Sequence, residues 1–135
     1  MAELGELLGG LTALLFILAS MNYIVKFVNR KWVVKLPKES KFKQRFPSRM
    51  KFLMKNHRYF AFGAAVTMVA HVIVQVLFRW VAVTGIVTAS LAVVTVVLGV
   101  IMYKAKKRTP AMLTAHRISV TALVTSLLVH VVTRV

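Results

Sequence analysis

Two stretches of the chain decide its organisation: residues 57–71, HRYFAFGAAVTMVAH, and residues 116–130, HRISVTALVTSLLVH. Each begins and ends with a histidine, and together they hold all four histidines, at the same separation of fourteen residues. In an α-helix, fourteen steps of ~100° return to within ~40° of the starting face and rise ~21 Å. Each pair is therefore expected on one stripe of one helix, at two depths. That separation is too long for one metal ion, whose ligands lie ~2 Å away. It suits two flat cofactors at different heights, each held by one histidine from each helix.

The composition is that of a membrane protein. The chain has 135 residues, of which 59% are hydrophobic and only three are acidic, and its mean hydropathy is +0.75. Apolar runs of about 20 residues with few charges are typical of membrane-spanning helices. We therefore expect an all-α membrane protein, a four-helix up-down transmembrane bundle that forms one domain over residues 1–135.

Four apolar stretches predict the spans, at about 7–29, 58–80, 81–103 and 111–133. The first could instead be a secretory signal peptide, but Glu3 and Glu6 stand where such a peptide carries positive charge. The third is rich in valine and threonine, which in water would favour strands. In lipid, a span of this length must be helical unless a barrel closes around it.

Two helix starts carry their own signals. Ser48, directly after Pro47, is expected to cap a helix that begins in the membrane interface and leads into the second span. Thr109-Pro110 suits the start of the fourth span, because proline is favoured in the first turn of a helix.

A basic segment, residues 30–56, joins the first two spans. From residue 26 to residue 58 there are twelve bases against a single acid, Glu39, with aromatic residues between them. Beside a membrane helix, this pattern predicts contact with the anionic cytoplasmic leaflet of a lipid membrane. Nucleic-acid binding uses the same ingredients, but the adjacent spans favour lipid, and we expect no nucleic-acid partner.

The distribution of charge predicts the topology. Sixteen of the nineteen bases fall in residues 26–58 and 104–108, which two spans separate. The positive-inside rule places both segments in the cytoplasm and both termini outside (N-out/C-out), in what we expect to be a prokaryotic cytoplasmic membrane. The second and fourth spans are then parallel and lie diagonally across the bundle. His57 and His116 share a level near the cytoplasmic face, and His71 and His130 share one nearer the outside.

The paired histidines resemble a known pattern. Two His-x13-His membrane helices are similar to those of the di-haem cytochrome b group, found in the cytochrome b subunits of quinol-oxidising complexes and, with slight spacing changes, in ferric-reductase-type membrane domains. The resemblance covers roughly residues 48–135, and the first helix carries no motif. It implies two bis-histidine haems b, with His57 and His116 on the inner iron and His71 and His130 on the outer iron. Because cysteine is absent, no iron–sulfur cluster or covalently attached c-type haem can be built, and any haem must be b-type.

We therefore expect a membrane cytochrome that carries electrons between a cytoplasmic-side and an outer-side partner. Helix geometry sets the two irons about 20 Å apart, and six-coordinate iron favours electron transfer over oxygen binding. The resemblance implies a quinone or a soluble redox protein as partner. The basic segment suits an acidic electron carrier or oxidoreductase subunit, although lipid contact explains it without one. The sequence leaves open whether the chain is an electron-transfer protein or a subunit of an oxidoreductase.

Glycines are candidates for close contact with the cofactors. Gly85 and Gly99 are fourteen residues apart in the third span, near the outer and inner levels respectively. Glycine permits close approach, and the di-haem group places glycines on helices beside its haems; ordinary small-residue helix packing is the alternative. Gly9 and Gly10 in the first span suit the same role at the outer level.

Arginines are candidates for the haem propionates. Arg58 and Arg117 directly follow the two inner histidines, and guanidinium groups pair with carboxylates bidentately. Alternatively both only mark the cytoplasmic border, and Lys55 agrees with either interpretation. Arg79 and Arg134 are the bases available near the outer haem.

Three polar residues inside the spans have open roles. Thr67 and Ser126 each lie four residues before an outer histidine and could accept its second ring N–H, although a hydrogen bond to their own helix backbone is the favoured alternative. Gln75 suits contact with the outer haem or a quinone, or packing against a neighbouring helix.

Two other classes of protein compete with the cytochrome. A small four-helix multidrug-type transporter has a similar size, but relies on a membrane-embedded carboxylate, and no acidic residue lies within any predicted span. A cofactor-free membrane anchor or structural subunit of a larger complex would leave the two identical histidine spacings to coincidence.

Overall fold

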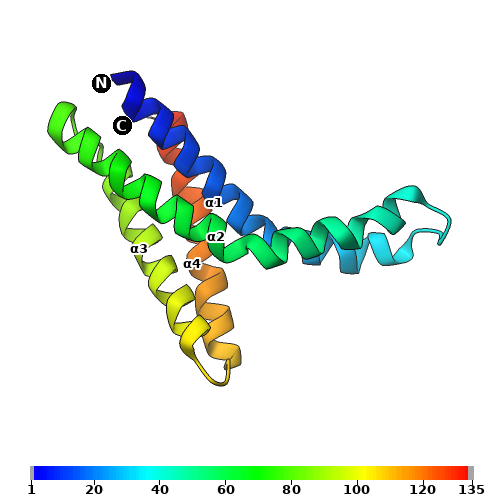
Figure 1. Ribbon diagram of the computed structural model, residues 1–135. Helices are drawn as coiled ribbons and strands as arrows, with labels where there is room; N and C mark the ends of the chain where they lie inside the picture. Colours follow the sequence, from blue (N-terminus) through cyan, green and yellow to red (C-terminus); the bar gives the residue numbers. More distant parts are fainter. Residues whose placement is uncertain (1, 134–135) are drawn as a thin grey trace.

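The computed structural model describes residues 2–133, and these residues are almost entirely helical (Figure 1). The helices are α1 (Ala2–Lys31), a short 3₁₀ turn η1 (Val33–Lys35), α2 (Lys41–Phe78), α3 (Val83–Lys104) and α4 (Pro110–Thr133). Each of the four α-helices is long and apolar enough to cross a membrane. The expected all-α fold with four such helices is confirmed, including a helical conformation for the valine- and threonine-rich third span.

The helices form two hairpins, α1 with α2 and α3 with α4. Between the hairpins, α1 contacts α4 and α2 contacts α3, whereas within the described residues α2 and α4 make no close backbone contact. Helices α2 and α4 therefore lie diagonally. In Figure 1 the hairpins meet near the start of α1 and the end of α4 and diverge toward the α3–α4 turn.

A small packed core lies at the centre of the four helices. It contains Phe16 of α1, Ala64 of α2, Ala92 of α3, and Leu123 and Leu127 of α4. The two alanines have no exposed surface, and small residues let membrane helices approach closely. Ala64 and Leu123 each lie midway between the two histidines of their helix. The tightest packing therefore separates the two histidine levels.

Most other large apolar side chains face outward, as expected for a surface in contact with lipid. Val132 is 82% exposed and Phe62 is 72% exposed. An apolar surface of this extent is not stable in water. The exposed side chains thus agree with the membrane-spanning interpretation of the four helices.

Helix α2 is longer than a membrane crossing requires. Its 38 residues extend ~57 Å, against ~30 Å for the hydrocarbon core. Together with the end of α1 and η1, its first part forms a projection that extends away from the bundle, here called the arm (residues 26–56; Figure 1). Lys43 fixes the turn of the arm, because its Nζ donates to the carbonyls of Val34 (2.9 Å) and Leu36 (2.6 Å).

The predicted cap at Ser48 is wrong. Helix α2 begins at Lys41, and Ser40 occupies the N-cap position without a side-chain hydrogen bond. Ser48 lies inside the helix, after Pro47. A proline inside a helix removes one backbone hydrogen bond, and the contacts of α2 with α1 and η1 along the arm offset that loss. The cap at Ser48 was predicted from neighbouring residues alone. The contacts that offset the loss at Pro47 join α2 to other elements, which those neighbouring residues do not reveal.

The other predicted boundaries differ from the structure by a few residues. Helix α2 ends at Phe78 and α3 begins at Val83, so Arg79–Ala82 form a short non-helical link rather than a direct junction of two spans. Helix α4 begins at Pro110 as predicted, and the hydroxyl of Thr109 accepts the backbone N–H of Met112 (3.3 Å).

Candidate cofactor site

The histidines of α2 are held by backbone carbonyls of α1. Nδ1 of His57 lies 2.8 Å from the carbonyl oxygen of Ala19, and Nδ1 of His71 lies 2.9 Å from that of Gly5. Gly5 and Ala19 are themselves fourteen residues apart. Because α1 and α2 are antiparallel neighbours in one hairpin, a step of fourteen residues forward along α2 corresponds to a step of fourteen residues back along α1.

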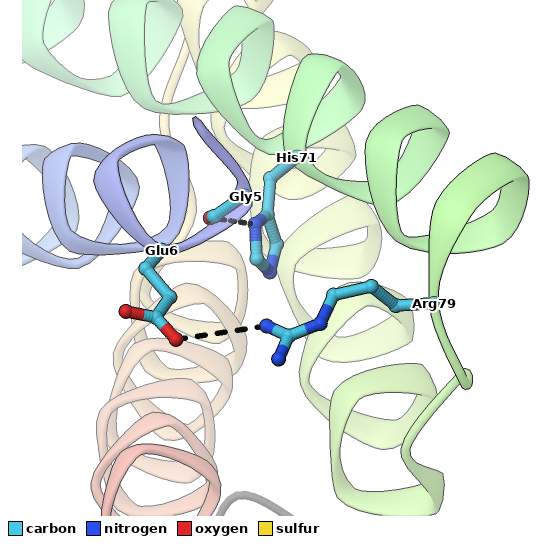
Figure 2. A network of polar contacts seen from close by, with 4 residues as sticks. All are labelled: Gly5, Glu6, His71 and Arg79. Atoms are coloured by element: carbon cyan, nitrogen blue, oxygen red, sulfur yellow. Dashed lines mark hydrogen bonds and ion pairs between the residues drawn. The ribbon is translucent and has the colours of Figure 1, made fainter. Parts of the chain in front are cut away.

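These contacts fix the protonation pattern of the two imidazoles. A carbonyl oxygen only accepts, so Nδ1 of His57 and of His71 must carry the hydrogen. Nε2 of each neutral ring then presents a lone pair, which is the form in which histidine binds a metal. Figure 2 shows the ring of His71 against the start of α1, with Nδ1 directed to Gly5.

The histidines of α4 are held differently from each other. Nδ1 of His130 lies 2.9 Å from the hydroxyl oxygen of Thr84 on α3. Nδ1 of His116 is buried and has no hydrogen-bond partner among residues 2–133. Leu98 stands fourteen residues after Thr84, so an apolar side chain occupies the matching position of α3 at the level of His116.

The hairpins bring the histidines together in two pairs, one at each level. His57 and His116 line the same cavity and are close enough to interact electrostatically. His71 and His130 likewise lie near enough that a charge on one would act on the other. Each pair takes one histidine from α2 and one from α4, the two diagonal helices.

A large cavity opens between the hairpins at the level of His57 and His116. Its volume is about 1870 Å³. Both histidines line it, together with Gly99, Arg58 and Arg117, and most of its remaining lining is apolar. The cavity lies where the hairpins diverge, so its walls come from all four helices. The outer histidines are not part of this lining.

Two arginines adjoin tyrosines of the opposite hairpin at this cavity. The guanidinium of Arg58 lies 5.7 Å from the ring centroid of Tyr103 on α3 and 5.2 Å from that of Tyr59. The guanidinium of Arg117 lies 5.6 Å from the ring centroid of Tyr23 on α1. Within the described residues neither arginine has an acidic partner, since the one ion pair found there joins Arg79 to Glu6.

Three glycines lie against the histidine rings. A Cβ added at Gly9 would stand 2.9 Å from Cε1 of His71, one at Gly85 3.2 Å from Cε1 of His130, and one at Gly99 3.5 Å from Cε1 of His116. Gly85 and Gly99 thus lie at the outer and inner histidine levels, next to the imidazoles themselves. Gly10 has no neighbour within 4 Å of such a Cβ, so it does not contact a histidine ring.

The hydroxyls proposed as ring partners bind elsewhere. Thr67 donates to its own helix at Gly63 (3.0 Å) and lies 3.0 Å from the hydroxyl of Thr12. Ser126 lies 2.7 Å from the hydroxyl of Thr88. In their place the structure uses the backbone carbonyl of Gly5 and the hydroxyl of Thr84, which sequence reasoning missed. A backbone carbonyl is the same at every residue and leaves no signal in the sequence.

Two of the remaining polar candidates, Arg79 and Gln75, lie near the outer level. Arg79 pairs with Glu6 at 3.6 Å beside His71 (Figure 2), and both side chains are substantially exposed, so the pair contributes at most ~1 kcal/mol. Oε1 of Gln75 is buried without a partner among residues 2–133. Lys55 lines the inner cavity, and Arg134 lies outside the described residues.

Among the described residues, no three histidine, cysteine or acidic side chains gather to form a metal site. Comparisons of the chain with protein-family models, with curated proteins and with solved structures gave no match.

Proposed function

We propose that this chain is a membrane b-type di-haem cytochrome, which carries electrons across the membrane between a cytoplasmic-side and an outer-side partner. The observation that carries the proposal is the pairing of histidines from α2 and α4 at two levels, with an inner cavity of about 1870 Å³ between His57 and His116.

The residues present fit a haem at the inner level. The tautomer of His57 leaves Nε2 available to a metal, and the cavity is largely apolar, as a flat macrocycle requires. His57 and His116 would hold the haem iron, while Arg58 and Arg117 would pair with the propionates. When bound, haem supplies the one-electron redox change; the chain provides ligation, burial and orientation.

The outer level offers the same ligand chemistry. His71 presents Nε2 because Gly5 binds its Nδ1, and His130 faces it from α4. The packed layer around Ala64, Ala92 and Leu123 lies between the two levels. It would keep the two haems separate while leaving them near enough for electron tunnelling.

The distribution of bases supports an N-out/C-out orientation. Residues 26–58 and 104–108 hold sixteen of the nineteen bases, and the apolar parts of α2 and α3 separate these two segments along the chain. In that orientation His57 and His116 lie at the cytoplasmic level and His71 and His130 at the outer level. A quinone or a redox protein at either face would be the electron donor or acceptor.

The proposal is tested by a reduced-minus-oxidised optical spectrum with pyridine haemochrome quantitation on the purified chain. We expect two b-type haems per chain, falling to one in His71→Ala and in His130→Ala. Ser90→Ala is the matched control, because Ser90 is exposed and its hydroxyl binds its own helix at Ile86 (2.9 Å); it should retain both haems. A helical, well-expressed chain without haem would contradict the proposal and favour a cofactor-free membrane anchor.

A further inference from the structure

A second pocket lies on the arm, away from the histidines. Its volume is about 410 Å³. Its floor is apolar and includes Val25 of α1, which is 7% exposed, and Phe46, Met50 and Leu53 of α2. It shares no lining residue with the inner cavity.

A row of three cations borders this pocket. Lys41, Arg45 and Arg49 all line it and are spaced four residues apart on α2. Steps of four residues drift by only ~40° and rise ~6 Å, so the three charges follow one edge of the pocket. All three side chains are exposed, and within residues 2–133 none forms a hydrogen bond or an ion pair.

The start of α2 adds to the positive potential of this edge. Lys41 is the first residue of the helix, and Ser40 makes no side-chain hydrogen bond to the first turn. The N–H groups of a first turn and the helix dipole favour negative charge. Glu39 is the one acid of the arm and does not line the pocket.

We propose that this pocket binds an anionic phospholipid, with the headgroup phosphate along Lys41, Arg45 and Arg49 and an acyl chain over the apolar floor. The row of cations suits a phosphate group. The apolar floor is filled only by a ligand that also has a hydrocarbon chain. Four helices able to cross a membrane bring this edge of the arm to a lipid surface.

The aromatic residues of the pocket favour lipid over nucleic acid. A nucleic acid would stack its bases on exposed aromatic faces. Phe46 is half-buried and packs against Phe42, with ring centroids 5.3 Å apart, so only Phe42, which is 55% exposed, has an exposed face at this pocket. Elsewhere on the arm, Trp32 and Phe52 are 61% and 60% exposed, which suits side chains that enter the membrane interface.

The test is a titration of the delipidated full-length chain in non-ionic detergent, followed by native mass spectrometry. The probes are dioleoyl-phosphatidylglycerol and dioleoyl-phosphatidylcholine. We expect one phosphatidylglycerol to be retained per chain, at least ~10-fold more tightly than phosphatidylcholine, because each base near a phosphate contributes appreciably to lipid affinity. Equal retention of the two lipids by the unmodified chain would overturn the proposal, and this comparison needs no variant.

Charge-removal variants locate the site. The triple variant Lys41→Gln, Arg45→Gln, Arg49→Gln should lose at least ~10-fold in phosphatidylglycerol affinity, and Arg45→Gln alone should lose part of it. The matched control Lys104→Gln, Lys106→Gln, Lys107→Gln also removes three charges from a cytoplasmic segment, and should change the affinity less than ~2-fold. An equal loss in both triple variants, or unchanged affinity in Arg45→Gln, would contradict a site on the arm.

Competition separates the lipid from other anions. Inorganic phosphate and a single-stranded oligonucleotide are added to the lipid-bound chain. Neither should displace phosphatidylglycerol, because neither fills the apolar floor. Displacement by phosphate would assign the pocket to a free anion, and displacement by the oligonucleotide to a nucleic acid. Lipid binding in this test does not depend on haem. The phospholipid proposal can therefore fail while the cytochrome proposal stands, and the cytochrome proposal can fail while the phospholipid proposal stands.

Discussion

At the residue scale, the four histidines share one role in the proposed function but have three kinds of hydrogen-bond environment. His57 and His71 donate to carbonyl oxygens of α1. His130 contacts the hydroxyl of Thr84, and Nδ1 of His116 has no partner within residues 2–133. Because the atom bonded to Nδ1 tunes the basicity of a ligating imidazole, the two levels should differ in redox properties.

Gly9 and Gly10 provide a matched pair for the outer level. In Gly9→Ala the added Cβ would stand 2.9 Å from Cε1 of His71, so the ring must move, at a cost of about 1–3 kcal/mol in the free energy of unfolding. If the proposed haems are bound, we expect Gly9→Ala to lose the outer one and keep the inner one, measured by pyridine haemochrome quantitation. Gly10→Ala meets no neighbour within 4 Å and should keep both haems. Equal haem content in the two variants would contradict the assignment.

Leu98 provides a test of the inner level. In Leu98→Thr, a hydroxyl should reach Nδ1 of His116 as Thr84 reaches His130. A hydrogen bond accepted from Nδ1–H makes the imidazole a stronger donor to ferric iron, so the midpoint potential of the proposed inner haem should fall. A bond of about 0.5–1.5 kcal/mol corresponds to ~20–65 mV for one electron. Leu98→Val has the shape of threonine without its hydroxyl and is the control for redox potentiometry. A fall of the same size in both variants would show that the hydroxyl is not the cause.

At the element scale, hydroxyl pairs join α3 to α4. Thr88 donates to the carbonyl of Thr84 in its own helix (2.8 Å), so the hydroxyl of Ser126 must donate to Thr88. Thr95 and Ser119 repeat this arrangement two turns away: Thr95 donates to its own helix at Leu91, and Ser119 to Thr95. Together with Thr84 and His130 these pairs form a polar seam inside an otherwise apolar hairpin. The seam sets the register in which His116 and His130 meet α3.

A double-mutant cycle of Thr88→Val and Ser126→Ala measures one pair of this seam. Interhelical hydrogen bonds in membranes contribute about 0.6 kcal/mol on average and about 1.7 kcal/mol at most, and we expect a coupling energy in that range. The measurement is the free energy of unfolding in mixed micelles, followed by circular dichroism. Ser90→Ala, which removes a bond within one helix, should show no coupling to Ser126→Ala. A coupling of similar size between Ser90→Ala and Ser126→Ala would mean that the cycle does not measure the hydrogen bond between Thr88 and Ser126.

At the scale of the whole molecule, the two hairpins meet at a layer of small and apolar residues and diverge on one side of it. Ala64 and Ala92 have no exposed surface, and the inner cavity opens beyond them. The same divergence carries the arm away from α3 and α4 (Figure 1). The shape of the molecule therefore depends on one contact layer, which also separates the two histidine levels.

The cysteine-free chain allows a direct test of orientation. In intact cells, a membrane-impermeant maleimide should label Glu3→Cys, while Lys38→Cys and Lys106→Cys should be labelled only after the cells are permeabilised. The reason is that cytoplasmic segments carry the excess of bases, and Lys38 and Lys106 lie in the two basic segments. The parent chain, which has no cysteine, gives the background. Labelling in the opposite pattern would reverse the proposed topology.

The sequence by itself determined the features that depend only on local geometry and composition. Apolar runs located the four helices, because the requirement for internal hydrogen bonding in lipid acts on each span separately. The spacing of fourteen residues put each pair of histidines on one stripe, because it reflects the pitch of a single helix. The start of α4 at Pro110 followed from local chemistry, whereas the same kind of reasoning failed at Ser48, inside α2.

Only the tertiary structure decided which atoms surround the histidines. The carbonyls of Gly5 and Ala19, the hydroxyl of Thr84 and the unpartnered Nδ1 of His116 all depend on how the helices are set against one another. The same is true of the inner cavity and of the pocket on the arm. A sequence states which side chain each position carries, but every residue has the same backbone carbonyl. Which carbonyl meets which ring is fixed by packing between helices, and that packing is a property of the whole fold.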